Sequence, residues 1–393
     1  MAITTLDLLN SRVDLSDVLS WRVASTPRFI SLFRTPRVSD SDLFGNAGLS
    51  CAFATEHKWL EGIETPKTKV VLEYEYSNGL GNFTVPDAFG WQVGDLFHIC
   101  GEVAVLRVET VSGATLGASL AAANGSTFTL EGYSAPSETL LAFDSRPIQE
   151  GSTSGEDFFA QSRVESNYTQ IFRGDVSLSG TAQAVAAAGM ENVLSVQLQH
   201  ATDAIVRRIN SALIYGVRVQ RSASSPGTLG GLYYFGTQSG GLSRTYADEA
   251  LTLNKLNLAA QDVSDAGCVP DTIVCGSGQA QVISSLTASQ IHIPQGSTTS
   301  GNYVETFVTS AGGHVLRVVV EPSLPSGDVW VCDTRGLALV PLQGRALHTE
   351  PASTPGMDGA RAILLGEYTA EFKNARQAFC RISGLKKAED VLA

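Results

Sequence analysis

The stretch NVLSVQLQHATDAIVRRINSALIY, residues 192–215, carries the clearest periodic pattern of the chain. Its apolar side chains recur at spacings of three and four, which places them on one face of an α-helix about six turns long. This face consists of Leu194, Leu198, Ala201, Ile205, Ile209 and Ala212. Because polar side chains occupy the opposite face, we expect this spine helix to lie on another element rather than to be enclosed on all sides.

Gly216 directly follows the spine helix, and glycine at that position commonly ends a helix in the left-handed conformation. We therefore predict a left-handed stop at Gly216. His200 is the only side chain of the helix whose type could serve as a catalytic acid or base near neutral pH. It has no second histidine at helical spacing with which to share a metal ion, so we interpret it as structural.

The composition limits the possible classes of protein. A chain of 393 residues favours two or more compact regions. Charged residues make up 17% of it, against about 25% in soluble domains, and its 38 glycines favour a β-rich fold with many turns. We hypothesise that other copies of the chain cover much of its surface. The net charge of −12 argues against tight, sequence-independent binding of nucleic acid, but it permits a protein that surrounds nucleic acid without gripping it.

The lack of a targeting signal and the spacing of the cysteines favour a chain that folds in a cytoplasm. No run of 18 apolar residues is present, so the sequence predicts no membrane-spanning segment. The start, MAITTLDLLNSR, lacks a basic region and carries Asp7 where a signal peptide would be apolar. The cysteines are scattered without a Cys-x-x-Cys pair, and in a reducing compartment they are expected to be small buried side chains. They are Cys51, Cys100, Cys268, Cys275, Cys332 and Cys380.

Residues 1–50 have the pattern of an extended arm. They interleave five arginines with five aspartates, and Pro27 and Pro36 interrupt any helix. The arm is either a flexible terminus or a strap across a neighbouring subunit, and we favour the strap. Residues 55–62, TEHKWLEG, are predicted to form a short helical turn anchored by Trp59.

A β-rich excursion follows the arm, leaving near Pro66 and returning near Pro147. Residues 69–76, KVVLEYEY, alternate apolar and acidic side chains and predict a half-buried strand. Further short strands are predicted at FHIC (97–100), EVAVLRVETV (102–111), STFTLEGY (126–133) and ETLLAFD (138–144). The excursion therefore carries a small β-module.

The second half of the chain reads as α/β and ends in a β segment. The Gly/Ser-rich residues 222–243 contain aromatic side chains, which favour an ordered loop. Helices are predicted at 248–267 and 278–286, strands at 272–275, 314–322, 329–333 and 360–372, and an exposed loop at 292–303.

The search for catalytic chemistry yields no site. Residues 275–278, CGSG, lack the third glycine and the later acidic residue of a dinucleotide-binding turn. Residues 48–52, GLSCA, depart from the nucleophile elbow at the last position. Glu367 and Glu371 share one face of the last predicted strand, where a solvated face or a subunit contact is favoured over a catalytic pair. We predict no catalytic, cofactor-binding or metal-ligating residue, no cofactor, and no enzymatic activity.

The order of these parts resembles the major capsid protein of tailed bacteriophages, with its Hong Kong 97-like α+β fold. The same family is indicated by five phrases in their order along the chain: NYTQIF, SGTAQAV, GTLGGLYYF, VWVCDTRGLALVPLQGR and LLGEYTAEFKNARQAF. They cover most of residues 160–390. The excursion is longer than the plain extended loop of that fold, which suggests an inserted β-module.

The resemblance implies a division into five parts. These are an N-terminal arm (1–65), an extended loop with the inserted module (66–148), a peripheral domain with the spine helix (149–239), an axial domain (240–345), and the return strands with the tail (346–393). It places the loop 292–303, or one nearby, at the capsomer axis.

The implied function is self-assembly, as pentamers and hexamers, into the icosahedral shell around the double-stranded DNA of a tailed phage, with no sequence-specific DNA binding and no membrane. The location would be the virion, after assembly in the host bacterial cytoplasm. A separate scaffolding protein is expected because the excursion starts by residue 66, together with a portal and a decoration protein. A covalent crosslink is not expected, because no lysine lies between Lys69 and Lys255 at the tip of the loop.

Candidate contacts between subunits follow from charge. Arginines on and just after the spine helix would meet Glu73 or Glu75 of a neighbour's extended loop; these are Arg207, Arg208, Arg218 and Arg221. The alternative, to which we give equal weight, is that these arginines are ordinary solvent-exposed side chains without a partner subunit. Two other functions stay open: an encapsulin-type shell of a cellular nanocompartment, and a cytoplasmic β-rich enzyme.

Overall fold

The structure is a computed structural model, and it describes most of the chain. The described residues are 27–34, 51–62, 68–85, 88, 91–102, 104–123, 128–134, 139–147, 162–184, 193–238, 241–287, 306–310, 312–352, 356 and 358–392. Most of the arm and the whole of the predicted loop 292–303 lie outside these residues. The chain divides into two compact units, Leu60–Glu165 and the combination of Met1–Trp59 with Ser166–Ala393.

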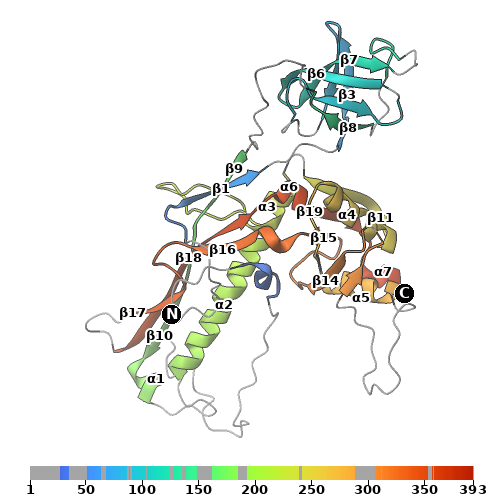
Figure 1. The fold of residues 1–393 in the computed structure, drawn as a ribbon. Helices are drawn as coiled ribbons and strands as arrows, with labels where there is room; N and C mark the ends of the chain where they lie inside the picture. Colours follow the sequence, from blue (N-terminus) through green and yellow to red (C-terminus); the bar gives the residue numbers. More distant parts are fainter. Residues whose placement is uncertain are drawn as a thin grey trace. The chain divides into compact units, whose positions relative to one another are not determined.

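The unit Leu60–Glu165 contains a seven-stranded antiparallel sheet in the order β2-β8-β5-β6-β7-β4-β3 (Figure 1). Its core is aromatic and separate from those of the other unit, and it centres on Phe83, Trp91 and Phe97, each at most 3% exposed. The strands are β2 (Thr68–Val70), β3 (Glu73–Ser77), β4 (Leu80–Thr84), β5 (Leu96–Ile99), β6 (Ala104–Ser112), β7 (Thr115–Ala123) and β8 (Leu140–Ser145).

This sheet curls back on itself, because its two end strands are consecutive pieces of one segment. The Val71 N–H donates to the Thr139 carbonyl on one side, and the Leu72 N–H donates to the Thr84 carbonyl on the other, each at 2.7 Å. The single predicted strand 69–76 is therefore wrong: the chain bends at this point, which buries Val71 and exposes Leu72.

Two further details of the module differ from the sequence prediction. The predicted strand 126–133 is wrong for the described residues from 128 on, which form turns. They place the buried Leu130 against the core, and its carbonyl accepts a hydrogen bond from the Tyr74 hydroxyl. Strands β4 and β7 are absent from the prediction, because glycines and small side chains weaken their period-two pattern.

In the other unit, the predicted spine helix is confirmed as α2 (Val193–Tyr215). It packs on a four-stranded sheet in which β18 (Gly359–Phe372) pairs with β10 (Gln170–Ser179), β16 (Leu337–Pro341) and β17 (His348–Pro351) (Figure 1). The predicted strand 360–372 is thus confirmed.

The spine helix approaches the sheet closely because β10 offers a glycine beneath it. A Cβ at Gly174 would lie 3.2 Å from Cδ1 of Ile205. Ile205, Ile209 and Leu213 are buried on this helix, and each contributes about 1.5–3 kcal/mol before entropy is counted.

The end of the spine helix is set by close packing rather than by a left-handed residue. Gly216 has no positive φ, so the predicted left-handed stop is wrong. A Cβ on Gly216 would lie 2.4 Å from the carbonyl oxygens of both Ala212 and Leu229. The chain turns there because only glycine lets the segment around Leu229 come this close.

The described part of the arm packs on the core of its own chain. It forms a short 3-10 helix, η2 (Phe29–Leu32), with Phe29 fully buried. The Glu321 carboxylate accepts hydrogen bonds from the N–H groups of Arg28 and Phe29, and the Asn210 side chain accepts one from Ile30. These contacts satisfy N–H groups that the start of a helix leaves free. The strap across a neighbouring subunit stays a prediction.

A six-stranded mixed sheet forms the rest of this unit, in the order β11-β19-β15-β12-β14-β13. The predicted strands 272–275, 314–322 and 329–333 correspond to β12, β14 and β15, and the predicted helix 278–286 to α5. The elements are β11 (Leu242–Glu249), α4 (Leu253–Asp265), β12 (Thr272–Cys275), α5 (Ser277–Thr287), β13 (Thr306–Val308), β14 (Val315–Val320), β15 (Val329–Cys332), β19 (Phe379–Leu385) and α7 (Ala388–Leu392).

Other elements correct or add to the prediction. The predicted helical turn 55–62 is wrong: it is strand β1 (Glu56–Gly62), paired with β9 (Ser162–Tyr168), although Trp59 is the buried anchor that the sequence predicts. The predicted helix 248–267 begins later than expected, because β11, which pairs with β19, extends to Glu249. Besides η2 and α7, the short helices absent from the prediction are α1 (Gly180–Ala184), α3 (Leu232–Gly236), η4 (Thr334–Gly336) and α6 (Ala375–Ala378).

Candidate assembly surfaces

The spine helix and β10 form a shallow depression that arginines surround. It is lined by Arg173, Gly174, Asp175, Ala201, Ala204, Ile205 and Arg208. Asp175 accepts hydrogen bonds from Arg173 and Arg361, each at 2.7 Å, and these two guanidinium groups lower the pKa of its carboxyl to about 2. The depression therefore combines a floor of small and apolar side chains with a net positive rim.

Two predicted contact residues lie on the spine helix itself. Arg208 is exposed and donates one long hydrogen bond, 3.4 Å, to the carbonyl of Arg173, whereas Arg207 is half-buried. This leaves most of the hydrogen-bonding capacity of the Arg208 guanidinium directed to solvent.

The two arginines after the helix contact their own chain. Arg221 donates from Nη2 to Oε1 of Glu367 at 2.9 Å, and the guanidinium of Arg218 lies 5.4 Å from the centre of the Tyr168 ring. Glu73 and Glu75 are exposed on β3. Within its own chain Arg221 is thus paired with Glu367, and the contact with Glu73 or Glu75 of a neighbour stays a prediction.

Glu367 is the centre of a buried ionic cluster. Its side chain is 2% exposed and receives the Arg345 guanidinium at 2.9 Å and the Thr169 hydroxyl at 2.7 Å, besides Arg221. The interpretation of its strand face as solvated is therefore wrong. Sequence reasoning missed this because the three partners come from distant segments, and the alternating pattern of β18 does not reveal what lies opposite.

Glu371, on the same face of β18, belongs to a second polar cluster. Its Oε1 lies 2.6 Å from Nε2 of His57, and its Oε2 lies 2.9 Å from Nζ of Lys373, which directly follows the strand. Burial raises the pKa of this carboxyl, but hydrogen bonds from His57 and Lys373 outweigh burial and leave the pKa below its usual value. The cluster fastens β1 to the sheet.

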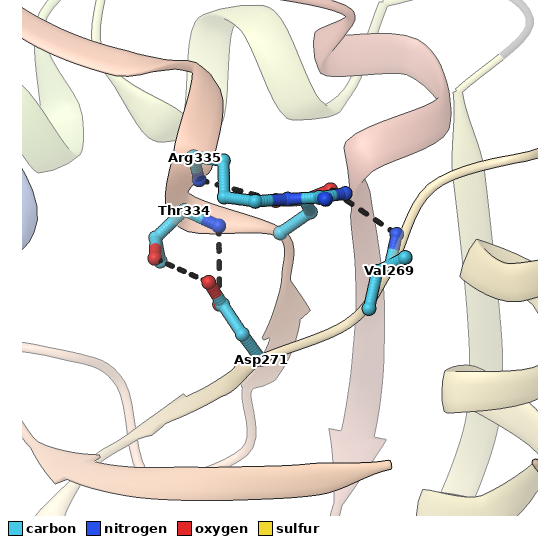
Figure 2. A network of polar contacts seen from close by, with 5 residues as sticks. Val269, Asp271, Thr334 and Arg335 are labelled. Atoms are coloured by element: carbon cyan, nitrogen blue, oxygen red, sulfur yellow. Dashed lines mark hydrogen bonds and ion pairs between the residues drawn. The ribbon is translucent and has the colours of Figure 1, made fainter.

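A third network fixes the crossover between the two large sheets of this unit, where β15 leads through η4 into β16. Figure 2 shows Thr334 directed to Asp271, which accepts hydrogen bonds from its N–H at 3.1 Å and its hydroxyl at 2.7 Å. Asp333 accepts from the Arg335 side chain and from the Val269 N–H. Burial raises the pKa of Asp333, yet these hydrogen bonds lower it on balance.

The cysteines differ in burial. Cys275, Cys332 and Cys380 are buried as predicted, and burial raises the pKa of the Cys275 and Cys380 thiols to about 12. The prediction is wrong for Cys100, which is exposed. Within the described residues, no three His, Cys, Asp or Glu side chains gather as metal ligands would. No helix among those residues has the length and apolar character needed to cross a bilayer.

These clusters tie distant segments of the chain to one another. The sequence of the chain matches the family described as SU10 major capsid protein over residues 5–386. The chain belongs to this family. It is a major capsid protein: copies associate into the closed shell of a phage particle, and its location is the capsid of the virion. The family is one of structural proteins, which argues against the enzyme alternative.

Solved structures similar to this chain include capsids and an encapsulin. The capsid of Myoviridae phage XM1 has 11% identity and a TM-score of 0.47 and covers 98% of this chain and 99% of its own. The capsid of a native GTA particle has 9% identity and a TM-score of 0.48, over 95% and 94%. The SrpI encapsulin of Synechococcus elongatus PCC 7942 has 12% identity and a TM-score of 0.43, over 59% and 80%. No curated protein matches the chain. All three TM-scores lie below 0.5, so the assignment rests on the sequence family.

Proposed function

We propose that this major capsid protein assembles as pentamers and hexamers into an icosahedral shell that encloses the double-stranded DNA genome of a tailed phage. The observation that carries the proposal is the family match over residues 5–386. Heterologous contacts between identical copies close such rings, and obligate interfaces bury more than about 2,000 Å². A net charge of −12 suits a container whose DNA must remain free to move.

The proposal also assigns each segment of the chain to a part of the capsid subunit. The arm would be residues 1–65, the extended loop 66–148, the peripheral domain 149–239 with the return strands 346–393, and the axial domain 240–345. Two strands cross this division, because β16 pairs with β18 and β19 pairs with β15. The partition into units supports the separate extended loop, although the compact unit Leu60–Glu165 is wider at both ends. Its own aromatic core is consistent with an inserted module.

Contacts between copies would join Arg207, Arg208, Arg218 or Arg221 of one subunit to Glu73 or Glu75 of another. The exposure of both glutamates and of Arg208 supports this pairing. Arg221 would take part with the side of its guanidinium that Glu367 leaves open, since the side chain is 38% exposed.

Reversing the charge of the spine helix tests the proposal. In the variant R207E/R208E, we expect folded subunits that no longer form shells, because both copies then present negative charge at the contact. Sedimentation of the purified chain measures shells, and circular dichroism measures folding. The matched control is R317E, which reverses an exposed arginine on β14 and should assemble normally. Normal shells from R207E/R208E would reject the contact.

The partners beyond the chain itself would be a separate scaffolding protein, a portal and a decoration protein, with assembly in the cytoplasm of the bacterial host. Expression of the chain alone and together with its neighbouring phage genes tests this. We expect uniform closed particles only from the combined expression, and uniform particles from the chain alone would remove the need for a scaffolding protein.

A further inference from the structure

The depression between the spine helix and β10 has a positively charged rim, although the chain as a whole is acidic. Three arginines reach it from three elements: Arg208 from α2, Arg173 from β10 and Arg361 from β18. The acidic side chain among them is Asp175, which also lines the depression. Three arginines against one aspartate leave two positive charges in excess here, in a chain whose net charge is −12.

Contacts with Arg173 hold the three guanidinium groups near one another. The Arg173 carbonyl accepts a hydrogen bond from Nη1 of Arg208 at 3.4 Å. The Arg173 side chain donates from Nε and Nη2 to Asp175, and Nη2 of Arg361 donates to the same carboxylate at 2.7 Å. These two arginines lower the pKa of Asp175 to about 2, so it stays charged at neutral pH. The folded chain therefore arranges the cationic rim before any ligand arrives.

The guanidinium groups retain N–H donors that are open to solvent. Arg208 is exposed, and its long hydrogen bond uses one donor of a group that carries several. The side chains of Arg173 and Arg361 are 53% and 37% exposed. Gly174 and two alanines of α2 form part of the floor beside them. Because these residues are small, a ligand can approach the arginines closely.

Two further acidic side chains belong to the same elements or to the same sheet, but neither lines the depression. Asp203 is exposed on α2. Glu350 lies in the same row of the sheet as Asp175, because both are register partners of Ile363. Its Oε1 lies 2.9 Å from Nε2 of His348. The excess of positive charge at the rim therefore remains.

Excess positive charge and planar donors favour an anion with several oxygens. A guanidinium group donates two parallel hydrogen bonds to one phosphate, and its fixed geometry suits this ligand better than an ammonium group does. The DNA inside the proposed shell carries one negative charge per about 1.7 Å of its axis. It is thus the polyanion that the proposed function brings to every copy of the chain.

We propose that the depression is a phosphate-binding site and that it takes backbone phosphate groups of the enclosed double-stranded DNA. The inference rests on the proposed function, which supplies this ligand. Contacts to phosphate carry no sequence information, so the site is consistent with a shell that does not bind DNA sequence-specifically. Arg208 then contacts DNA, and Arg207, Arg218 and Arg221 remain candidates for the contact with a neighbouring subunit.

Binding by a single copy would be weak, because the other charges of the chain repel DNA. Contacts with about two or three phosphates make the logarithm of the affinity fall with the logarithm of the salt concentration, with a slope of about −2 to −3. A shell repeats the site on every copy, so many weak contacts act together while each stays short-lived. Such contacts hold DNA near the shell and still let it move.

The direct test measures the affinity of free, full-length subunits for a short DNA duplex, by fluorescence anisotropy at low salt. R208Q should weaken binding about three- to tenfold and reduce the salt slope by about 1. D175N should instead strengthen binding, because it removes the negative charge and releases donors of Arg173 and Arg361. The matched control R317Q removes an exposed arginine of β14 and should bind as the wild type does.

Unchanged affinity in R208Q overturns the inference, and so does weaker binding in D175N. Inorganic phosphate, added as a competitor at constant ionic strength, separates the two sources of phosphate. Neighbouring phosphates of one duplex bind together, so displacing the DNA should need a large molar excess of inorganic phosphate over DNA phosphate. Displacement at an equal concentration would identify the free ion as the ligand and overturn the assignment to DNA.

Phenylglyoxal, which modifies accessible arginines, tests the site inside particles. Mass spectrometry compares the modification of Arg173 and Arg208 in empty and in DNA-filled particles, with Arg317 as the control. We expect Arg173 and Arg208 to lose most of their reactivity in the filled particles alone, because phosphate groups then occupy their donors. Arg317 should react equally in both kinds of particle.

Two results with particles would overturn the inference while the proposed function stands. One is equal reactivity of Arg173 and Arg208 in empty and filled particles. The other is full protection already in empty particles, because another copy of the chain would then cover the site. A chain that never forms particles would instead overturn the proposed function, and with it the source of the ligand.

Discussion

Strands β3 and β18 both carry two glutamates on one face, yet their surroundings are opposite. Glu73 and Glu75 are exposed on β3, while Glu367 and Glu371 on β18 are 2% and 8% exposed. The difference lies in what faces each strand: β18 receives Arg221, Arg345 and His57 from three distant segments. A buried carboxylate is tolerated only where cations and hydrogen bonds accompany it. The glutamates of β18 thus hold one subunit together, whereas those of β3 are exposed on the described structure.

The largest expected effect comes from removing the cations around Glu367. R221A/R345A leaves a buried carboxylate without a cation, and we expect it to lower the free energy of unfolding by about 3–5 kcal/mol. Adding E367Q to that variant should recover most of the loss, because the buried charge is then gone. Urea unfolding of free subunits measures all three proteins. If R221A/R345A is as stable as the wild type, the ionic cluster does not hold the fold.

The pH-dependent effect expected at Glu371 is of middle size. Its pKa is lowered in the folded chain, so its contribution to stability is present above the usual value of 4.5 and is lost as the pH falls through the lower folded value. E371Q should cost about 1.5–3 kcal/mol at pH 7, the range for hydrogen bonds to charged groups. It should also make unfolding less sensitive to pH below 4.5. Parallel pH profiles of wild type and E371Q would contradict this.

A smaller effect is expected at Asp175, because the side chains of its partners Arg173 and Arg361 are 53% and 37% exposed and solvent screens their charges. Its pKa of about 2 lies below the usual 3.8, so the contribution of the pair is complete above 3.8 and is lost as the pH falls toward 2. D175N should nevertheless cost less than about 1 kcal/mol, and salt should reduce the cost further. Thermal melts at low and high salt provide the measurement, and a loss that salt leaves unchanged would show that Asp175 is effectively buried.

The smallest effect on stability is expected on the exposed strand, which supplies the contrast to Glu367. E73A and E75A should each change the free energy of unfolding by less than about 0.5 kcal/mol, as surface substitutions do. Urea unfolding measures this, and the same variants should lower particle yield if β3 faces a neighbour. A large loss of subunit stability in E73A would erase the distinction between the two strands.

The sequence predicts those elements whose pattern follows from their own burial. The predicted bounds of the spine helix, β12, α5 and β18 lie within one or two residues of the observed ones, because each turns a regular apolar face or an uninterrupted apolar run toward a core. TEHKWLEG predicts a helical turn because it has good helix formers, but the pairing of β1 with the distant β9 decides the outcome. Pairing with distant segments also explains why the sequence predicts neither strand β11, which pairs with β19, nor the bend between Val71 and Leu72.

The polar sites were less predictable than the elements. That Glu367 and Glu371 share a face follows from strand geometry, but their burial depends on Arg221, Arg345 and His57. No local pattern announces such partners. In the sequence, only the phrases that resemble the capsid family indicated that the segments carrying these residues belong to one fold. The family match over residues 5–386 supports that interpretation.

Negative-stain electron microscopy of the purified protein tests the central claim most directly. If copies of this chain brace one another into a shell, the images will show closed, hollow particles of uniform size. A field of single folded subunits under every condition of salt, pH and scaffolding partner would contradict the account.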